Sequence, residues 1–526
     1  MPNTENSLPE QQKLVQTLYS RLQEDNAHAE LIETHISYIL LLGDFAYKIK
    51  KVVNFGFLDY STLELRKHYC EEEVHLNNRL ASGLYLDVVA ITIENGSPCL
   101  GGTGEPCEYA VRMHRFPDTA QLDKMLQAGK LKASHIDELA DRIASFHAGI
   151  PAAGNDTDYG SAVQAHKPVQ ENFRQIRERI TNKSWLEQLE KIETWSEQEF
   201  AKCVPLLEQR KKLGFIRHCH GDLHLGNVAI HNGQVIVFDC IEFNPSLYWI
   251  DVISEIAFCC MDLEDHRRPD LAYRFLNRYL EHTGDYAGLQ VFRYYLAYRA
   301  MVRAKVACIR AEQGGTARNH ALLEFEKYLQ QAAGYTISHE PLLLITHGLS
   351  GSGKTYISRM LAEQLPAIHL RSDVERKRLF SQAGQHTSTE FGAGIYTPDA
   401  TEKTYQRLQD LGAMIVAQGI SAIIDATFLD KARRDAFHIA ANKAHARFCI
   451  LDLYAPEEVL RERILQRSRE KSDISDADIR ILEHQLSRPH ALDPDETAYR
   501  LLIDTTAPDL ERIITEQVQS IKKPLE

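Results

Sequence analysis

Residues 342–358 read Leu-Leu-Leu-Ile-Thr-His-Gly-Leu-Ser-Gly-Ser-Gly-Lys-Thr-Tyr-Ile-Ser. An apolar β-run is followed by a glycine-rich turn and then by residues that suit a helix. The turn contains Gly348-x-x-x-x-Gly353-Lys354-Thr355, the pattern of a phosphate-binding loop. An ordinary strand–turn–helix corner is the alternative, but a match flanked by a strand and a helix favours a nucleotide site.

Each position of this loop has an expected task. Its glycines let the backbone bend so that N–H groups reach phosphate oxygens, and the helix that follows directs its positive end at the same anion. Lys354 should reach the β- and γ-phosphates, and Thr355 should place its hydroxyl on Mg²⁺. The remaining nucleotide-binding candidates of the turn are Gly348, Ser350, Gly351, Ser352 and Gly353.

Composition indicates two or three domains. The chain has 526 residues, 44% of them hydrophobic, which is enough for real cores. The net charge of −13 argues against a broad, non-specific nucleic-acid binder, although a local basic groove is compatible with it. The ten cysteines lack paired C-x-x-C spacing, and the sequence has neither a signal-peptide core nor a membrane-length apolar run. We therefore expect a soluble, reduced, cytoplasmic protein.

Acids end two further strands of the C-terminal half. Residues 367–373 end in Asp373, and residues 421–425 end in Asp425, with Thr427 close behind. Strands that alternate with helices specify a parallel, doubly wound sheet, whose ligands bind at the carboxyl ends of the strands. Asp373 is the better candidate for the base that takes the proton of an acceptor hydroxyl, and Asp425 for positioning Mg²⁺. Helix capping is the alternative for either acid.

Arginines of the same half are candidates for phosphate contacts. Arg376 begins a basic run in the helix after Asp373, and residues 457–470 form an arginine-dense helix that includes Arg463 and Arg467. Polar residues 471–476 follow. This segment suggests a lid whose guanidinium groups close over the phosphates. A solvated charged helix is the alternative.

The N-terminal half contains a predicted hairpin formed by residues 36–42 and 45–52. Its second strand includes Phe-Ala-Tyr-Lys48, similar to the kinase strand whose lysine holds the α- and β-phosphates. The next helix is rich in acids, and we favour Glu73 as the partner of Lys48. A solvated lysine and an exposed acidic face are the alternatives.

A second constellation lies at His220-Gly-Asp222-Leu-His-Leu-Gly-Asn227, followed by a strand that ends in Asp239. This spacing matches the catalytic loop and metal-binding strand of protein-kinase-like enzymes. Asp222 would accept the proton of an attacking hydroxyl, and Asn227 and Asp239 would hold Mg²⁺. An ordinary polar loop is the alternative. A zinc cluster at the neighbouring histidines lacks a fourth ligand at standard spacing.

Two regions resemble known families on these motifs. Residues 30–330, roughly, resemble the aminoglycoside phosphotransferase family within the protein-kinase-like superfamily, on the Asp222–Asn227 loop and Val-Phe-Asp239. Residues 340–520, roughly, resemble small P-loop kinases, including the polynucleotide-kinase 5′-hydroxyl domain, gluconate- and shikimate-type kinases and zeta-type toxins. The whole chain looks like bacterial proteins named bifunctional aminoglycoside phosphotransferase/ATP-binding proteins.

The resemblance implies a fold for each half. It implies an α+β protein-kinase-like domain over residues 1–335 and an α/β P-loop NTPase kinase domain with a doubly wound parallel sheet over residues 336–526. It also implies that Arg376 contacts the acceptor or its phosphate. One departure concerns residues 33–37, which lie where the family has a glycine-rich loop but contain no glycine.

We therefore predict an ATP- and Mg²⁺-dependent phosphotransferase with two nucleotide-binding domains, GTP being the other candidate donor. The γ-phosphate would pass to a hydroxyl of a small molecule or of a nucleic-acid or nucleotide-sugar acceptor. The alternative is that only the C-terminal half is a kinase, acting on RNA or DNA ends or on nucleotide sugars. The N-terminal half would then bind substrate or regulate. No membrane partner is expected.

Overall fold

The computed structural model describes residues 7–25, 28–56, 58–312, 317–382, 394–470, 479–489 and 491–522. Contacts between residues divide the chain into two compact units. Unit 1 contains Met1–Leu189, Ser196–Asp262 and Tyr298–Phe325, and unit 2 contains Glu190–Trp195, Leu263–Ala297 and Glu326–Glu526. The domain boundary at 335/336 stays a prediction.

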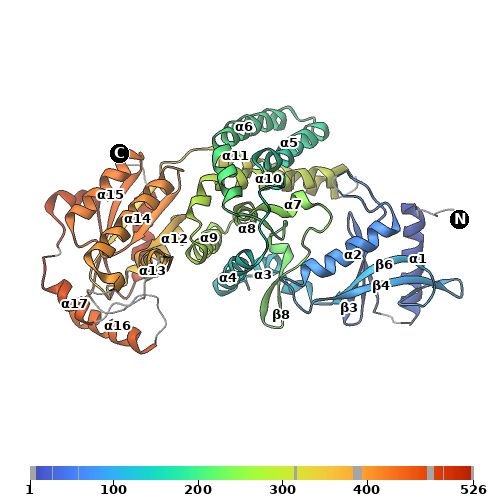
Figure 1. Cartoon of the computed structure of the whole chain (residues 1–526), viewed down its shortest axis with the longest axis horizontal. Helices are drawn as coiled ribbons and strands as arrows, with labels where there is room; N and C mark the ends of the chain where they lie inside the picture. The colour runs from blue at the N-terminus through green and yellow to red at the C-terminus, as the bar shows by residue number, and fades with distance from the viewer. Residues whose placement is uncertain are drawn as a thin grey trace. The chain divides into compact units, whose positions relative to one another are not determined.

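Unit 1 is built on a six-stranded antiparallel sheet with the order β1-β2-β3-β6-β4-β5 (blue in Figure 1). The predicted hairpin is confirmed as β2 and β3, which turn at Gly43 with φ of +57°. The strands are β1 (Glu30–Glu33), β2 (Ser37–Leu42), β3 (Phe45–Lys50), β4 (Tyr85–Glu94), β5 (Ser97–Leu100) and β6 (Pro106–His114).

A helix covers each face of this sheet. Successive residues of a strand point to opposite faces, so neighbouring residues pack against different helices. Leucines at helical spacing in residues 8–25 predict a helix, and this stretch forms α1 (Leu8–Asp25), whose Val15 packs with Ile49 of β3. On the other face lies α2 (Leu63–Asn77), whose Cys70 packs with Val111 of β6. Lys48 and Lys50 therefore point to the α2 side.

Helices make up most of the chain after β6. The sequence predicts a single helix near residues 170–212. Two are present, because Asn182 caps a new helix by accepting N–H groups of Ser184 and Trp185. The helices are α3 (Leu122–Gln127), α4 (Ala133–Gly149), α5 (Ala162–Arg179), α6 (Lys183–Lys212), α7 (Pro245–Tyr248), α8 (Val252–Asp265), α10 (Leu289–Glu312) and α11 (Ala317–Thr336).

Two small antiparallel ladders interrupt these helices and carry the polar loop at Asp222. The first pairs β7 (Ile216–His218) with β10 (Trp249–Asp251), and the second pairs β8 (Val228–His231) with β9 (Gln234–Val237). The loop that contains Asp222 lies between β7 and β8, and Asp239 follows β9.

Unit 2 contains the predicted parallel sheet, with the order β12-β13-β11-β14-β15. The central strand β11 is buried at all six positions, as its apolar run predicts. The strands are β11 (Leu342–His347), β12 (Ala367–Arg371), β13 (Ser421–Asp425), β14 (Arg447–Tyr454) and β15 (Arg500–Asp504).

Helices alternate with these strands, and α12 and α18 pack on one face of the sheet, where Leu361 and Ile514 join the apolar core. The prediction that Asp373 ends a strand is wrong. The strand ends at Arg371, and Asp373 lies in the first turn of α13, where acids favour the helix. The helices are α12 (Lys354–Gln364), α13 (Ser372–Gln382), α14 (Pro398–Val416), α15 (Lys431–Lys443), α16 (Glu457–Glu470), α17 (Ile479–Leu486) and α18 (Leu510–Lys522).

One further helix of unit 2, α9 (Pro269–Thr283), precedes the sheet in sequence by many residues. It packs against α12 and the edge strand β12. The side chain of Asn277 donates to the carbonyl of Ala367 at 2.9 Å and accepts the N–H of His369 at 2.8 Å. Asn277 thus provides hydrogen bonds that a neighbouring strand would otherwise give to this edge.

None of the helices in the described part of the chain has the length and apolar character that crossing a membrane requires.

Candidate functional site

The loop after β7 brings Asp222 and Asn227 together. The amide nitrogen of Asn227 donates to Asp222 Oδ2 and to the Asp222 carbonyl, both at 3.0 Å. His220 braces this loop, because its Nδ1 accepts the N–H of Asp222 at 3.3 Å. Its Nε2 must then carry the proton, which it donates to the Phe238 carbonyl at 2.9 Å. The imidazole therefore connects the Asp222 loop to the residue before Asp239.

Asp222 is held in its ionised form. Burial alone would raise the pKa of this carboxyl, but the charge and hydrogen bond of His224, together with the charge of Arg303, lower it well below its usual range. His224 Nε2 lies 3.4 Å from Asp222 Oδ2, and Asp222 raises the pKa of that imidazole against the effect of burial.

Lys48 lies between two carboxylates on the same side of the sheet. The predicted pair with Glu73 is present, with Lys48 Nζ 2.8 Å from Glu73 Oε1, and Asp239 Oδ1 lies 2.5 Å from the same nitrogen. Burial would lower the pKa of Lys48, but Asp239 and Glu73 raise it well above its usual value. The ammonium thus remains charged and links α2 to the segment after β9.

A second buried lysine extends this network. Lys50 Nζ contacts Glu73 Oε2 at 2.5 Å and also contacts Glu242, which accepts from the hydroxyl of Tyr60 as well. Lys50 is 1% exposed and Glu73 is fully buried. The network therefore fixes the segment around Asp239 against the sheet through charged hydrogen bonds.

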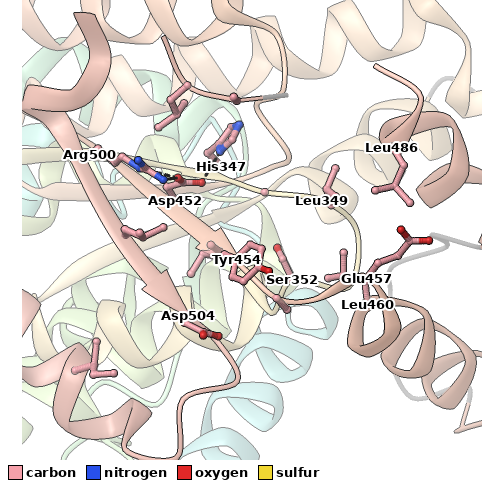
Figure 2. Close-up of a pocket in the computed structure, with 17 residues that line it drawn as sticks. His347, Leu349, Ser352, Asp452, Tyr454, Glu457, Leu460, Leu486, Arg500 and Asp504 are labelled. Atoms are coloured by element: carbon pink, nitrogen blue, oxygen red, sulfur yellow. Dashed lines mark hydrogen bonds and ion pairs between the residues drawn. The ribbon is translucent and has the colours of Figure 1, made fainter. Parts of the chain in front are cut away.

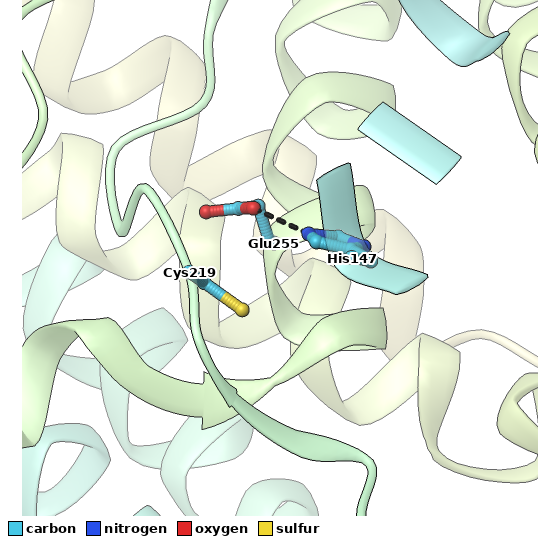
Figure 3. A group of neighbouring side chains, drawn as sticks. All are labelled: His147, Cys219 and Glu255. Carbon is cyan, nitrogen blue, oxygen red and sulfur yellow. Dashed lines mark hydrogen bonds and ion pairs between the residues drawn. The ribbon is translucent and has the colours of Figure 1, made fainter. Parts of the chain in front are cut away.

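A further buried group supports the loop from the helical side (Figure 3). Glu255 of α8 accepts the N–H of Gly221 at 2.7 Å and pairs with His147 Nε2 at 2.6 Å, and Cys219 lies beside them. These three side chains are of metal-ligating types, but both carboxylate oxygens of Glu255 already have partners in the protein. We interpret the group as a brace for the residue before Asp222.

Lys48, Asp222 and Asp239 line one cavity of about 960 Å³ in unit 1. The side chain of Asp239 is 47% exposed despite its pairing with Lys48, so its carboxylate is accessible from the cavity. Asp239 also has φ of +60°, a conformation that is uncommon outside glycine and that clusters at functional sites.

The β1–β2 turn lies at residues 34–36, in the stretch where the family has a glycine-rich loop and this sequence has no glycine. Its backbone groups form hydrogen bonds within the turn. The N–H of Thr34 donates to the Ser37 carbonyl at 2.9 Å, and the N–H of Ser37 donates to Thr34 Oγ1 at 3.0 Å. Ile36 lines the cavity. Two amides of this turn are thus already paired within the turn.

In unit 2 the glycine turn between β11 and α12 has the backbone that its sequence predicts. Gly348 has φ of +145°, and Gly351 and Gly353 have φ of +86°. A Cβ at Gly348 would lie 2.6 Å from the Leu453 carbonyl oxygen, which excludes any other residue without a backbone shift. The turn therefore depends on glycine for both conformation and space.

Lys354 and Thr355 begin the helix at this turn. Lys354 Nζ donates to the carbonyls of Gly348 at 3.1 Å and Leu349 at 2.7 Å. Burial lowers the pKa of Lys354 to about 8, and Asp425 and Asp373 only partly oppose this effect. Thr355 Oγ1 donates to Asp425 Oδ2 at 2.7 Å. A phosphate would offer the ammonium a stronger partner than the two carbonyls.

Asp373 and Asp425 line a second cavity, of about 410 Å³, together with Ser350, Gly351 and Gly353 of the glycine turn. Thr427 lies on its wall, with Oγ1 3.4 Å from the Tyr405 hydroxyl. Arg376 also lines it, and its guanidinium donates to the Ile395 carbonyl at 3.0 Å.

The two arginines predicted to clasp phosphates differ in their surroundings. Arg467 lines the cavity, and its charge reaches Lys354, whose pKa it lowers. Arg463 also lines it, but its guanidinium donates to Thr505 Oγ1 at 2.9 Å and to the Gly351 carbonyl at 3.3 Å. It thus joins the glycine turn to the segment after β15. The predicted lid combined the helix of residues 457–470 with the polar stretch 471–476. The helix is present as α16, whereas residues 471–476 lie outside the described residues, so closure of a lid stays a prediction.

A third cavity, of about 840 Å³, lies on the other side of the glycine turn (Figure 2). His347 Nδ1 and Asp452 Oδ1 are 2.7 Å apart at its wall, and Arg500 Nε donates to Asp452 Oδ2 at 2.8 Å. Its lining contains neither Lys354 nor Asp425. Gly348 and Ser352, two of the predicted nucleotide-binding residues, line this cavity and not the smaller one.

Two family models match the chain at these sites. Residues 70–292 match the phosphotransferase enzyme family, and residues 343–492 match an AAA domain. The first match contains the Asp222 loop and Asp239, and the second contains the glycine turn, Asp373 and Asp425. This chain is a kinase-type phosphotransferase. The predicted resemblance and the predicted fold classes of both halves are confirmed.

Relatives of this phosphotransferase include uncharacterized proteins of Mycobacterium bovis and Mycobacterium tuberculosis. Each is 29% identical over 451 residues, which cover 85% of this chain and 88% of the relative. The similarity therefore spans both kinase-type domains.

Solved structures with similar portions include a choline kinase from Cryptosporidium parvum and a gluconokinase from Sinorhizobium meliloti. The choline kinase is 12% identical, covers 60% of this chain and 95% of its own, and has a TM-score of 0.38. The gluconokinase is 16% identical, covers 35% of this chain and 93% of its own, and has a TM-score of 0.25.

Both cavities of the phosphotransferase offer donors that fit Mg²⁺, which prefers oxygen ligands. In unit 1 the Asp239 carboxylate lines the cavity. Asn227 does not line it, but its amide nitrogen is bonded to Asp222, which does, so its amide oxygen is the second candidate ligand. In unit 2 the Thr355 hydroxyl and the Asp425 carboxylate already converge.

Sequence reasoning missed several residues of the first site. Lys50 could have been found, because it lies two positions from Lys48 and so shares its face of the strand. Glu242, Tyr60 and Glu255 carry no motif, and only the tertiary fold of the phosphotransferase brings them to the loop.

Proposed function

We propose that the protein is an ATP- and Mg²⁺-dependent phosphotransferase with two separate sites, GTP being the other candidate donor. The observation that carries this proposal is the grouping of the four predicted aspartates. Asp222 and Asp239 line one cavity with Lys48, and Asp373 and Asp425 line another with Lys354. Each cavity thus combines a base candidate, a metal ligand and a phosphate-binding cation.

In the first site, Asp222 accepts the proton of the acceptor hydroxyl. Its lowered pKa keeps it ionised, so its main contribution is to orient the hydroxyl for in-line attack. Asn227 and Asp239 hold Mg²⁺, which when bound neutralises charge on the triphosphate. When the nucleotide binds, Lys48 breaks its ion pair with Asp239 and pairs with phosphate oxygens instead. It keeps its ion pair with Glu73.

In the second site, the glycine turn binds the phosphates through its N–H groups, and Lys354 leaves the two carbonyls for phosphate oxygens. Thr355 and Asp425 hold Mg²⁺, and Asp373 acts as the base. Arg467 stabilises charge on the transferred group. Arg376 contacts the acceptor, and Thr427 contacts the bound nucleotide.

A second candidate function is that only the C-terminal site transfers phosphate and the N-terminal half binds substrate or regulates. The β1–β2 turn favours it, because two of its amides are already paired and it contains no glycine. The acceptor of the C-terminal site would then be an RNA or DNA end or a nucleotide sugar.

Turnover of ATP by three full-length variants distinguishes these functions. Lys354→Ala should abolish turnover at the C-terminal site, Asp239→Ala should abolish it at the N-terminal site, and the double variant should be inactive. Lys67→Ala, an exposed lysine of α2, is the matched control. Residual turnover in Lys354→Ala that Asp239→Ala removes supports two sites. If Asp239→Ala changes neither turnover nor nucleotide binding, the second candidate holds. Turnover retained in the double variant overturns both.

The acceptor class is tested with labelled ATP. Metabolites with free hydroxyls, 5′- and 2′-hydroxyl oligonucleotides and UDP-sugars are compared in wild type, Asp222→Asn and Asp373→Asn. Transfer that depends on one aspartate only assigns the acceptor to that site. The ten cysteines are free thiols, which supports our proposal of a cytoplasmic location.

A further inference from the structure

Apolar side chains from several parts of unit 1 line the cavity that contains Asp222. They come from the β1–β2 turn, the segment after β9, α7 and α10, and they are Ile36, Phe243, Leu247, Val302, Val306 and Ile309. All of them keep part of their surface exposed, and Val306 is 40% exposed. Apolar surface that faces water in a concave site favours an apolar ligand, because binding removes that surface from water.

The α10 members of this set form one stripe, because spacings of four and three positions place Val302, Val306 and Ile309 on the same face of a helix. The stripe begins near the base candidate. Arg299, which precedes Val302 on this face, donates to the Gly221 carbonyl at 3.2 Å. At the rise of an α-helix, the segment from Arg299 to Ile309 spans about 15 Å. The stripe is therefore long enough for an extended ligand.

The carboxylates that line this cavity have cationic partners within the protein. The pairs are Asp239 with Lys48, Glu242 with Lys50, Glu171 with Arg174 and Asp222 with His224. A cationic group on a ligand would have to compete with one of these partners. The acidic side chains of the cavity therefore do not favour a cationic ligand.

The cations of the α10 wall are also offset. Arg299 donates to the Ser254 carbonyl and hydroxyl at 3.1 Å and to the Gly221 carbonyl, and two aromatic rings lie within 5.1 Å of its guanidinium. Burial lowers the pKa of Lys305 to about 8, and the charge of Glu171, which lines the same cavity, opposes this effect. An anionic ligand would have to compete with Glu171 for Lys305.

Lys167 lines the cavity where it is exposed to water. An exposed ammonium is solvated, so an ion pair there contributes little. Among the described residues that line the cavity, charges of both signs are therefore either paired or solvated. An ionic group on a ligand would lose water in the cavity without gaining a free counter-ion.

We propose that the acceptor of the N-terminal site is an uncharged hydroxyl compound with an extended apolar body. This inference rests on the proposed function of that site. The hydroxyl of the acceptor lies at Asp222, and its body packs along Val302, Val306 and Ile309. Such a compound covers the apolar stripe and leaves the ion pairs of the cavity intact.

The transfer itself balances in one displacement. The acceptor oxygen attacks the γ-phosphorus of ATP, its proton passes to the Asp222 carboxylate, and a new O–P bond forms. The bond between the γ-phosphorus and the β,γ-bridging oxygen breaks, and ADP leaves with that electron pair.

Binding is measured by calorimetry on the full chain, with Mg²⁺ and a non-hydrolysable ATP analogue at saturation so that the nucleotide sites are filled. The first probes are the primary alcohols butanol, hexanol and octanol, whose affinity should rise about threefold with each added methylene group. The second set compares octanol with ω-hydroxyoctanoate and ω-aminooctanol. Octanol should bind at least about tenfold more tightly than either charged probe, because an ionic end loses water without a free counter-ion.

Three variants locate the effect on the α10 stripe. The double variant Val302→Thr with Val306→Thr should weaken octanol binding at least about fivefold, because each hydroxyl replaces an apolar methyl group. Val306→Ile keeps the stripe apolar and should keep the affinity. The control is Val163→Thr, because Val163 of α5 is 66% exposed and does not line the cavity; it should change the affinity less than about twofold. An unchanged unfolding midpoint shows that each variant is folded.

The inference is overturned if affinity does not rise with chain length, if a charged probe binds more tightly than octanol, or if the threonine pair leaves octanol binding unchanged. Failure of the proposed function gives a different result. In that case a chain with Lys354→Ala does not bind the ATP analogue at all, whereas failure of the inference alone leaves this binding intact.

Discussion

Glu264 of unit 2 is a single side chain whose titration affects stability. Burial raises its pKa to about 7, although the Tyr335 hydroxyl donates to it and opposes the effect. Between pH 4.5 and 7 the folded protein therefore keeps a proton that the unfolded chain releases. The free energy of unfolding should fall as pH rises through this window and remain low above it.

Glu264→Gln should remove this penalty, because glutamine stays neutral and can still accept from Tyr335. Since the carboxyl keeps some contact with solvent, we expect a gain of about 1–2 kcal/mol at pH 8 that disappears near pH 4.5. Urea unfolding of both proteins at several pH values measures it. An equal difference at all pH values would contradict the assignment.

Gly348→Ala tests the glycine turn at one residue. The added Cβ would lie 2.6 Å from a backbone carbonyl, at φ of +145°. The strain of about 1–3 kcal/mol should weaken nucleotide binding at the C-terminal site at least about tenfold. Gly334→Ala is the control, because a Cβ there meets nothing within 4 Å inside α11. That substitution should leave nucleotide binding unchanged.

At the scale of elements, a buried charge network fixes the sheet of unit 1 to α2 and to the segment after β9. Lys50→Met would leave Glu73 and Glu242 without this cation, which should cost about 3–5 kcal/mol in urea unfolding of the full chain. Adding Glu242→Gln should recover part of the loss. The control Lys67→Met removes an exposed ion pair with Glu71 and should lower the free energy of unfolding by only about 0–1 kcal/mol. Equal effects at both lysines would contradict the network.

Elements with a strong local pattern could be predicted from the sequence, and those that depend on neighbours could not. The α1 bounds, the β2–β3 hairpin and the strand–turn–helix at Gly348 were predicted because hydrophobic period and glycine placement are local signals. β5 is a four-residue edge strand with little apolar pattern, and no sequence signal marked it.

The same distinction applies to the sites. The Lys48–Glu73 pair followed from a strand lysine and a helix acid in known motifs. The supports of the Asp222 loop could not be predicted, because Glu255 and Arg299 lie on distant helices whose packing is set by tertiary contacts. Asp373 lies in the first turn of α13 and not at a strand end, because acidic side chains there stabilise the start of the helix.

At the scale of the whole molecule, the two units do not coincide with one cut of the chain. Leu263–Ala297 belongs to unit 2, although the phosphotransferase family match extends to residue 292 and so includes most of this segment. Helix α9 contributes an ion pair between Arg274 and Glu363 at 2.7 Å and another between Glu281 and Arg371 at 2.9 Å. A C-terminal fragment of residues 340–526 therefore lacks a helix that packs on its own sheet.

The hydrogen bonds of Asn277 show what this fragment would lose at the edge of its sheet. Without α9, the carbonyl of Ala367 and the N–H of His369 would be left open on β12, and an open strand edge recruits strands from other molecules. We expect the fragment of residues 340–526 to self-associate in size-exclusion chromatography with light scattering, to a multiple of its mass that rises with concentration. A fragment that stays monomeric at all concentrations would show that this edge needs no cover. In the full-length protein, α9 therefore covers the β12 edge and prevents the sheet of one molecule from pairing with that of another.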